Sequence, residues 1–247
     1  MQKQDKPKVD KAAVDAAFEA LKTYDWGTDR KPLMPLDEAV IATHGDAAAC
    51  KDLETRLAAV LKTNASRAAK DYVCRKLMMI GTAQSVPALA PLLADKDLSH
   101  MARYALERIP APEAAQAMRD ALPKLSGAPK VGVIGSLGVR RDAASVPALA
   151  AALGDADKAV VCAAAGALGR IGSVEAAKAL GEAAKKAPEG VKLAVADGLL
   201  VCAETLLAAG NKAEALAIYK SLAGEDQPKH VRLAATRGLL AVAGKKE

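Results

Sequence analysis

The stretch SVPALAAALGDADKAVVCAAAGALGRIG, from Ser145 to Gly172, decides the fold class of this chain. Residues 146–153 place apolar side chains on one face of a helix, behind a proline that a first helical turn tolerates. The polar segment 154–157 interrupts this pattern and predicts a turn. The alanine-rich segment 158–171 then predicts a second helix, which Gly172 would end. The stretch therefore predicts two helices joined by a short turn.

The same hairpin recurs along most of the chain. Equivalent leucines of the second helices follow one another at intervals of 29 to 31 residues, a period typical of helical repeats, except for a last interval of 40 residues. They are Leu77, Leu106, Leu137, Leu168, Leu199 and Leu239. Because one hairpin cannot bury its own apolar face, neighbouring hairpins must stack. The predicted helix pairs are 46–62 with 66–80, 85–94 with 98–109, 112–124 with 129–141, 145–153 with 158–171, 174–186 with 190–208, and 212–223 with 229–243.

This unit resembles the HEAT repeat of the short bacterial kind, also called the phycobilisome-lyase-like HEAT repeat. The resemblance covers about Asp46 to Gly244. It implies an all-α, right-handed α-solenoid (a superhelix) of about six HEAT-like helical hairpins with an N-terminal helical cap. We expect a disordered tail over 1–8, a helical cap with an aromatic loop over 9–45, the solenoid over 46–244 and a short tail over 245–247. HEAT repeats serve many tasks, so the resemblance says little about function.

The composition agrees with closely stacked helices. The chain has 247 residues, of which 51% are hydrophobic but only 2% aromatic, so small aliphatic side chains must form the core. A continuous repeat predicts one elongated body. The four cysteines show no metal-binding or disulfide spacing. No phosphate-binding or hydrolase motif occurs. The sequence also lacks paired-histidine motifs, and this absence argues against the di-iron HEAT hydroxylases. We predict no catalytic, cofactor-binding or metal-binding residues.

An aromatic cluster marks the N-terminal segment, where Phe18, Tyr24 and the only tryptophan, Trp26, lie close together in sequence. These rings could stack on a ligand, but a hydrophobic lid over the first repeat is the favoured interpretation, because end repeats need capping. A loop through Pro32 and Pro35 should follow. The segment KTYDWGTDR is similar to the start of uncharacterised bacterial HEAT-repeat proteins, many of them exported. We therefore expect a soluble protein, either cytoplasmic or periplasmic after loss of a leader.

One charged position recurs on the inward face, seven residues before each aligned leucine. In HEAT repeats this position usually holds an arginine paired with an aspartate of a turn, which implies a structural ladder of ion pairs. The ladder residues here are Lys70, Lys130, Lys192 and Arg232, and their expected partners are Asp95, Asp157 and Asp226. Ser99 and Val161 depart from the pattern.

A second set of positions points away from the aligned leucine. Second helices of such solenoids usually form the concave surface, so these residues could make a sparse basic stripe there. They are Arg75, Arg108, Arg170 and Arg237, with Tyr104 as an aromatic neighbour. Other repeats lack the basic residue, and a solvated face is the simpler explanation.

Three functions compete on this evidence. A non-catalytic scaffold that binds a protein or peptide on the concave face needs only the predicted fold. Nucleic-acid or other polyanion binding through the arginines is the second, and the scarcity of aromatic residues disfavours a likeness to the DNA-alkylation-repeat glycosylases. The third is a subunit of an enzyme such as a chromophore-lyase-like complex, which a cluster of ionisable groups around Trp26 would favour. No segment is apolar enough to span a membrane. The apolar last helix, 231–243, predicts either self-association through this end or a chain cut from a longer one.

Overall fold

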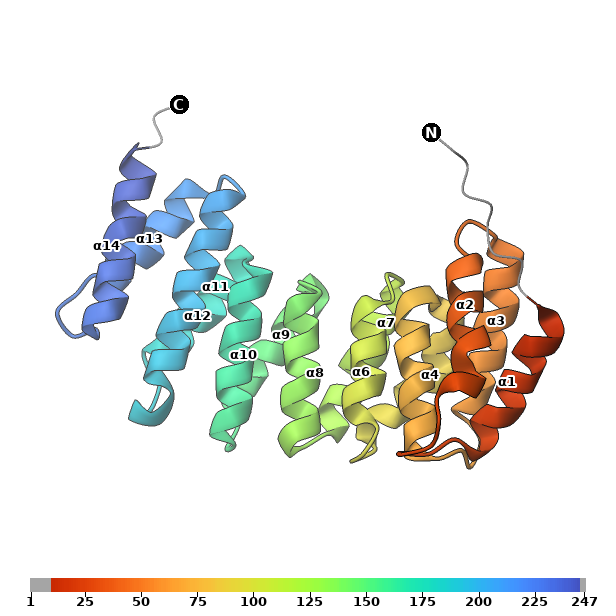
Figure 1. The fold of residues 1–247 in the computed structure, drawn as a ribbon. Helices are drawn as coiled ribbons and strands as arrows, with labels where there is room; N and C mark the ends of the chain where they lie inside the picture. The colour runs from red at the N-terminus through yellow and green to blue at the C-terminus, as the bar shows by residue number, and fades with distance from the viewer. Residues whose placement is uncertain (1–9, 245–247) are drawn as a thin grey trace, which may run out of the picture. The chain divides into compact units, whose positions relative to one another are not determined.

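The fold is that of a computed structural model, which describes residues 10–244. These residues form fourteen α-helices and five short 3-10 segments, and they contain no β-strand (Figure 1). The chain divides into two compact units, the first ending at Ala121 and the second beginning at Leu122. Each unit is an all-α solenoid of stacked helices. The boundary falls inside the third predicted hairpin, between its two helices.

Unit 1 begins with a two-helix cap and continues with helical hairpins. Its helices are α1 (Lys11–Thr23), α2 (Met34–Ala42), α3 (Ala47–Val60), α4 (Arg67–Ile80), α5 (Val86–Leu89), α6 (Ser99–Arg108) and α7 (Pro112–Ala121). Helix α1 packs on α2, α3 packs on α4, and α4 packs on α6. Leu21, Leu57 and Leu77, from three of these helices, are completely buried. Aspartate or serine caps begin α1, α3 and α4, as the first-turn N–H groups require.

Unit 2 repeats the hairpin more regularly. Its helices are α8 (Gly127–Val139), α9 (Val146–Ala152), α10 (Lys158–Ile171), α11 (Val174–Ala184), α12 (Glu189–Ala208), α13 (Lys212–Leu222) and α14 (Lys229–Gly244). The second helices form one layer, in which α10 packs between α8 and α12, and α14 packs on α12 (Figure 1). Leu137 and Leu168 are completely buried in this layer and Leu199 almost so. These three aligned leucines are therefore core residues of unit 2, whereas Leu239 is only half-buried.

Small residues let the second helices of unit 2 approach closely. A Cβ added to Gly138 would lie 2.7 Å from the Cα of Ala167, and one added to Gly169 would lie 2.6 Å from the carbonyl oxygen of Gly198. Within α8, the close contact lies at Gly138. Gly135 makes no such contact, because a Cβ added there would meet only open space.

The predicted helix boundaries agree with the structure to within a few residues, with one exception before α2. Pro32 and Pro35 do not lie in an extended loop. Pro32 belongs to a 3-10 turn (Lys31–Leu33) and Pro35 to the first turn of α2. A proline is well accommodated there because the first N–H groups of a helix have no partner within it. Gly172, the predicted helix terminator, has a left-handed φ of 63°.

All four cysteines are free thiols. Burial raises the pKa of Cys74 to about 12 and that of Cys202 to about 11, so both thiols stay protonated at neutral pH. Within residues 10–244, no group of three His, Cys, Asp or Glu side chains is arranged to hold a metal ion. Over the same residues, no helix combines the length and the apolar character that crossing a bilayer demands.

Candidate functional site

The turn Asp25–Thr28 carries Trp26 on the surface of unit 1. The backbone N–H and the hydroxyl of Thr28 both donate to the carbonyl oxygen of Asp25, at 3.1 and 2.6 Å. Gly27 follows Trp26 with a φ of 84°, which only glycine adopts without strain. The Asp25 carboxylate accepts the N–H of Trp26 at 2.8 Å. Local hydrogen bonds thus hold a tryptophan that is 65% exposed.

This turn is fastened to α4. The hydroxyl of Ser66, the N-cap of α4, donates to the carbonyl oxygen of Tyr24. The Tyr24 ring lies 6.4 Å from the ring of Tyr72 on α4, centroid to centroid. The Arg30 guanidinium lies 5.6 Å from the centroid of the Tyr72 ring. Tyr72, itself buried, is therefore the base against which the turn packs.

A carboxylate beneath these groups ties them to the cap. Asp37, in the first turn of α2, accepts hydrogen bonds from the Tyr72 hydroxyl and from Arg30, both at 2.8 Å. The ammonium of Lys76 lies 2.5 Å from the same carboxylate and 4.9 Å from the Tyr72 ring centroid. Asp37 also sits where a helix N-terminus favours negative charge. One carboxylate thus holds two cations and a phenol in place.

Burial raises the pKa of Asp37, but hydrogen bonds from Lys76 and Tyr72 and the charges of Lys76 and Arg30 outweigh it, so the pKa lies below its ordinary value. Burial and the hydrogen bond to Asp37 raise the pKa of Tyr72. At neutral pH the carboxyl is ionised and the phenol protonated. Neither group is poised to exchange a proton there.

Around this network lies a small pocket. It has a volume of about 190 Å³, and Tyr24, Trp26, Arg30, Tyr72 and Arg75 line it together with Ala68, Asp71 and Lys76. We name Tyr24, Trp26, Arg30, Tyr72 and Arg75 the Trp26 surface. Pockets for drug-sized ligands usually measure about 300–1,000 Å³. This pocket therefore matches a single side chain of a larger partner better than a free metabolite.

The Trp26 surface joins two sets of residues that the sequence analysis treats separately. Tyr24 and Trp26 come from the aromatic cluster, and Arg75 comes from the basic positions. Arg75 is 59% exposed and its Nε lies 3.1 Å from Asp71, four residues earlier on α4. Half of the six aromatic residues of the chain, Tyr24, Trp26 and Tyr72, gather here.

The lid interpretation is correct for Phe18 and wrong for Trp26. Phe18 is buried on the inner face of α1, and the Arg56 guanidinium lies 4.1 Å from its ring centroid. Trp26 is mostly exposed instead, because the turn that carries it projects beyond the cap. Phe18 does not line the pocket, so the three-residue cluster divides into a core residue and two site residues.

Sequence analysis missed Arg30, Asp37, Asp71, Tyr72 and Lys76. A signal was available for three of them, because Asp71 with Arg75 and Tyr72 with Lys76 are pairs four residues apart on one helix, which places each pair on one face. No local pattern links Arg30 or Asp37 to α4. Their contact with it depends on how the cap folds back.

Removing the Asp37 carboxylate should destabilise unit 1 in a pH-dependent way. Asp37→Asn should lose about 2 kcal/mol at pH 7, because hydrogen bonds to charged groups contribute about 1.5–3 kcal/mol. A lowered native pKa means that this stability is complete above the ordinary aspartate pKa of about 4 and is lost as the pH falls through the native value. Urea unfolding followed by far-ultraviolet circular dichroism, at pH 7 and at about pH 3, measures the difference.

Asp52→Asn is the matched control for this experiment, since Asp52 is exposed on α3. It should unfold like the wild type at both pH values. A loss for Asp37→Asn that is absent at pH 7, or that persists undiminished in acid, would contradict the assigned network.

The other basic positions are exposed but separate. In unit 1, Arg108 and Tyr104 lie on α6, beside α4, and the Tyr104 ring stacks on His100 with centroids 6.2 Å apart. In unit 2, Arg170 lies on α10 and Arg237 on α14, with α12 between these helices. A binding role for these four residues stays a prediction.

The predicted ladder has one clear rung, in unit 2. The Lys130 ammonium lies 2.6 Å from the Asp155 carboxylate of the turn before α10. The prediction that Asp157 is a ladder partner is wrong. Asp157 instead caps α10, where its carboxylate accepts the N–H of Ala159. Lys192 pairs with Glu189, on its own helix, at 2.9 Å. That hydrogen bond and, less strongly, the charge of Asp226 raise the pKa of Lys192.

The remaining ladder positions form no rung. Among residues 10–244, neither Lys70 nor Arg232 lies within ion-pair distance of a carboxylate. Asp95, one of the expected ladder partners, accepts the backbone N–H groups of Asp97 and Leu98. Ser99 occupies a ladder position in place of a cation. Its hydroxyl donates a hydrogen bond to the carbonyl oxygen of Leu93 at 2.8 Å, within the same hairpin.

The last helix, α14, leaves two leucines in solvent. Leu233 is 53% exposed and Leu240 is 68% exposed, and a spacing of seven residues puts both on one face. Val231, Ala235 and Gly238 form the buried face of the same helix. Self-association through α14 stays a prediction, with these two leucines as the residues available for it.

Comparison with known families supports the repeat assignment. Residues 126–199, which include α8 to α11 and the first half of α12, match the model described as HEAT repeats. This segment of the chain is similar to HEAT repeats. The match covers the regular hairpins of unit 2, where the second helices pack through Gly138, Gly169 and Gly198. No curated protein sequence matches the chain.

Several solved structures are similar to the chain at low identity. One is a crystal structure of an engineered protein, 19% identical, covering 92% of this chain and 68% of its own, with a TM-score of 0.45. Another is human deoxyhypusine hydroxylase in complex with glycerol, 16% identical, covering 95% and 97%, with a TM-score of 0.39. A second engineered protein is 20% identical, covering 92% and 96%, with a TM-score of 0.30. Likeness at this level carries no argument about activity.

Proposed function

We propose that this HEAT-repeat protein, of the short bacterial type, is a non-catalytic scaffold that binds a protein or peptide, and that the Trp26 surface is one of its contact sites. The exposure of Trp26 carries the proposal. Its 65% exposed ring is held by a turn and not left by disorder, since Thr28 and Ser66 fix the backbone on either side of it. Tryptophan and arginine are the residues that most often dominate binding energy at protein interfaces.

The charges of the Trp26 surface favour a protein partner over a polyanion. Arg30 is joined to Asp37 and Arg75 to Asp71, so only part of the positive charge is free. Nucleic-acid binding draws its affinity from many uncompensated cations that displace counterions. Partly neutralised arginines beside an exposed ring are more typical of a protein interface, where aromatic residues and arginine are enriched.

An enzymatic role has weaker support, although ionisable groups do gather around Trp26. The lowered pKa of Asp37 and the raised pKa of Tyr72 keep both groups in fixed protonation states at neutral pH. A general acid or base needs a pKa near the working pH. The hydrogen bonds of Asp37 and Tyr72 therefore favour a structural role, in which they hold the Trp26 surface in place, over a role in proton transfer.

Site-specific photocrosslinking tests this proposal. A photoreactive amino acid such as p-benzoylphenylalanine at position 26 should crosslink a discrete partner in cells of the source. The same group at Lys51, exposed on α3, is the control and should not. Equal crosslinking from both positions, or none from position 26, would remove the proposal.

Removing the Trp26 ring should then weaken binding of the partner that crosslinking identifies. Trp26→Ala should raise the Kd by about 30-fold, which corresponds to the roughly 2 kcal/mol that defines an interface hot spot. Lys22→Ala, exposed on α1, is the control and should change little. Isothermal titration calorimetry gives both values, and a Trp26→Ala change below about threefold would show that the ring is peripheral.

A further inference from the structure

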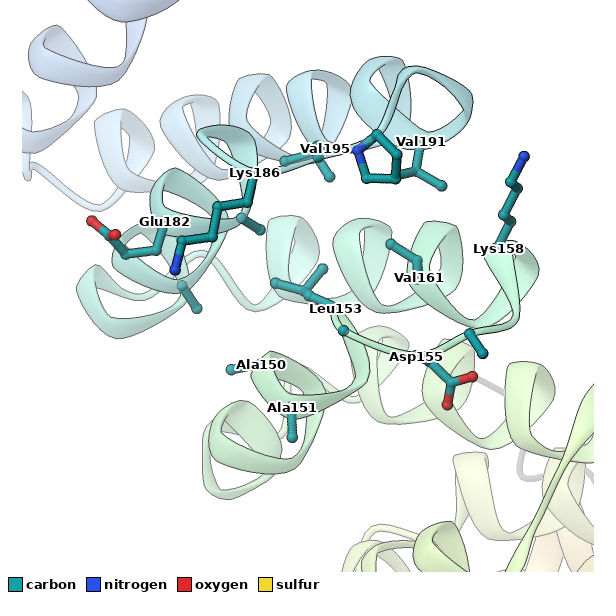
Figure 2. A pocket seen from close by; sticks show the side chains of 16 residues that line it. Ala150, Ala151, Leu153, Asp155, Lys158, Val161, Glu182, Lys186, Val191 and Val195 are labelled. Atoms are coloured by element: carbon teal, nitrogen blue, oxygen red, sulfur yellow. The ribbon is translucent and has the colours of Figure 1, made fainter.

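An apolar crevice opens in unit 2 between two consecutive hairpins. It has a volume of about 660 Å³, and its walls come from α9, α11 and the first turns of α10 and α12. Leu153, Val161, Val191 and Val195 form its apolar lining, with several alanines. Figure 2 shows Leu153 and Val161 between Lys158 on one side and Lys186 on the other. The volume falls in the range of ligand-binding pockets.

The sequence explains why the crevice is open here. Between the third and fourth hairpins, Lys130 of α8 and Asp155 of the turn before α10 meet at 2.6 Å. The equivalent positions one 31-residue repeat later are Val161 and Lys186. The cation of the rung is replaced by a short apolar side chain, and its carboxylate by a lysine. The rung is lost, and an apolar lining with a cation at its edge takes its place.

The charge at the mouth of the crevice is positive. Two carboxylates lie there, but Asp155 is joined to Lys130, and Glu182 is joined to Lys185 at 2.6 Å. In the described part of the chain, neither Lys158 nor Lys186 lies within ion-pair distance of a carboxylate. The charge of Lys186 acts on Glu182, after the larger effect of Lys185, to lower the pKa of Glu182. The two free ammonium groups favour an anionic occupant.

We infer that this crevice binds an acidic peptide segment of the partner, in which an aliphatic side chain enters beside Val161 and flanking carboxylates approach Lys158 and Lys186. This inference rests on the proposed scaffold function and specifies a second contact. The apolar lining gives an aliphatic side chain a dry environment, which provides affinity. The two cations restrict the choice to segments with Asp or Glu beside the anchor, which provides specificity.

The test uses a displayed library of random dodecapeptides, selected on the full-length protein. The wild type should enrich peptides with Leu, Ile or Val flanked by Asp or Glu. The decisive variant is Val161→Lys with Lys186→Asp, because it copies the Lys130–Asp155 rung and should fold as the preceding hairpin does. It should bind the enriched peptides at least tenfold more weakly, while its thermal unfolding midpoint stays near that of the wild type.

Charge reversal gives a second route that does not alter the core. Lys158→Glu and Lys186→Glu change exposed residues. Each substitution should weaken binding of the selected peptides about tenfold at low salt and less at high salt. Lys220→Glu is the matched control, since Lys220 is exposed on α13 and does not line the crevice. It should have a much smaller effect than Lys186→Glu.

Each other outcome overturns the inference. If the peptides bind the variant that carries Val161→Lys and Lys186→Asp as tightly as they bind the wild type, they contact another surface. That result contradicts peptide binding in the crevice but leaves the scaffold proposal standing. If the enriched peptides are aliphatic but contain no acidic residues, the two lysines do not select the occupant. If no peptide is enriched, the crevice has no peptide occupant, and crosslinking at position 26 still decides the scaffold proposal separately.

Discussion

Replacing Gly169 by valine should destabilise unit 2 by at least about 3 kcal/mol, the upper range for overpacking a close contact. A Cβ at this position of α10 would lie 2.6 Å from the carbonyl oxygen and 3.2 Å from the Cα of Gly198 on α12. Both are backbone atoms, so no side chain can turn aside. The two helices must separate, and the neighbouring apolar contacts of the layer are lost with them.

The same helix supplies a matched control. Gly166, three residues earlier, has open space around an added Cβ. Gly166→Ala should therefore stabilise the chain by up to about 1 kcal/mol through helix propensity, whereas Gly169→Ala should destabilise it despite the same gain. Urea unfolding followed by far-ultraviolet circular dichroism measures these variants. Equal behaviour of the two alanine variants would show that α10 and α12 are not in backbone contact.

Replacing Glu54 by alanine should cost unit 1 about 3 kcal/mol. Glu54 lies on α3 with only 1% of its surface exposed. Its carboxylate accepts the N–H of Thr82 at 2.7 Å, the hydroxyl of Ser85 at 2.6 Å and the hydroxyl of Thr82 at 3.0 Å. Alanine would leave these buried donors without an acceptor, and each such group costs about 1–3 kcal/mol. The loss would release α3 from the connection between α4 and α5.

Glu54→Gln separates hydrogen bonding from packing. It keeps the size of the side chain and one acceptor oxygen, so about half of the loss should remain. Urea unfolding followed by far-ultraviolet circular dichroism measures the loss. Asp52→Ala on the same helix should change little because Asp52 is exposed. A Glu54→Ala variant as stable as the wild type would mean that the Thr82 and Ser85 donors find other acceptors.

The repeat itself could be predicted from the sequence because its signals are local. Proline at a first turn, alanine in the second helix and Gly172 at its end each act within a few residues, and the regular leucine spacing sets the register. The buried positions of Leu137 and Leu168 follow from that register. The division of the chain after Ala121 could not be predicted, since every hairpin pattern continues across it.

The candidate site was only partly predictable, because it depends on contacts between distant segments. Trp26 was recognisable as unusual, but its sequence is compatible with a buried lid as well as with an exposed turn. The choice depends on Ser66 and Tyr72, about forty residues away, which hold the turn against α4. Glu54 resembles an ordinary surface residue of a helix, and only its contact with Thr82 and Ser85 shows that it is buried.

Fluorescence quenching of Trp26 tests the central claim most directly. Trp26 is the only tryptophan, so the whole signal reports on the Trp26 surface. We predict emission close to that of free tryptophan in water, with strong quenching by iodide, which Arg30 and Arg75 attract, and weaker quenching by caesium, which they repel. Blue-shifted emission that iodide barely quenches would place the ring under a lid and contradict the proposed contact site.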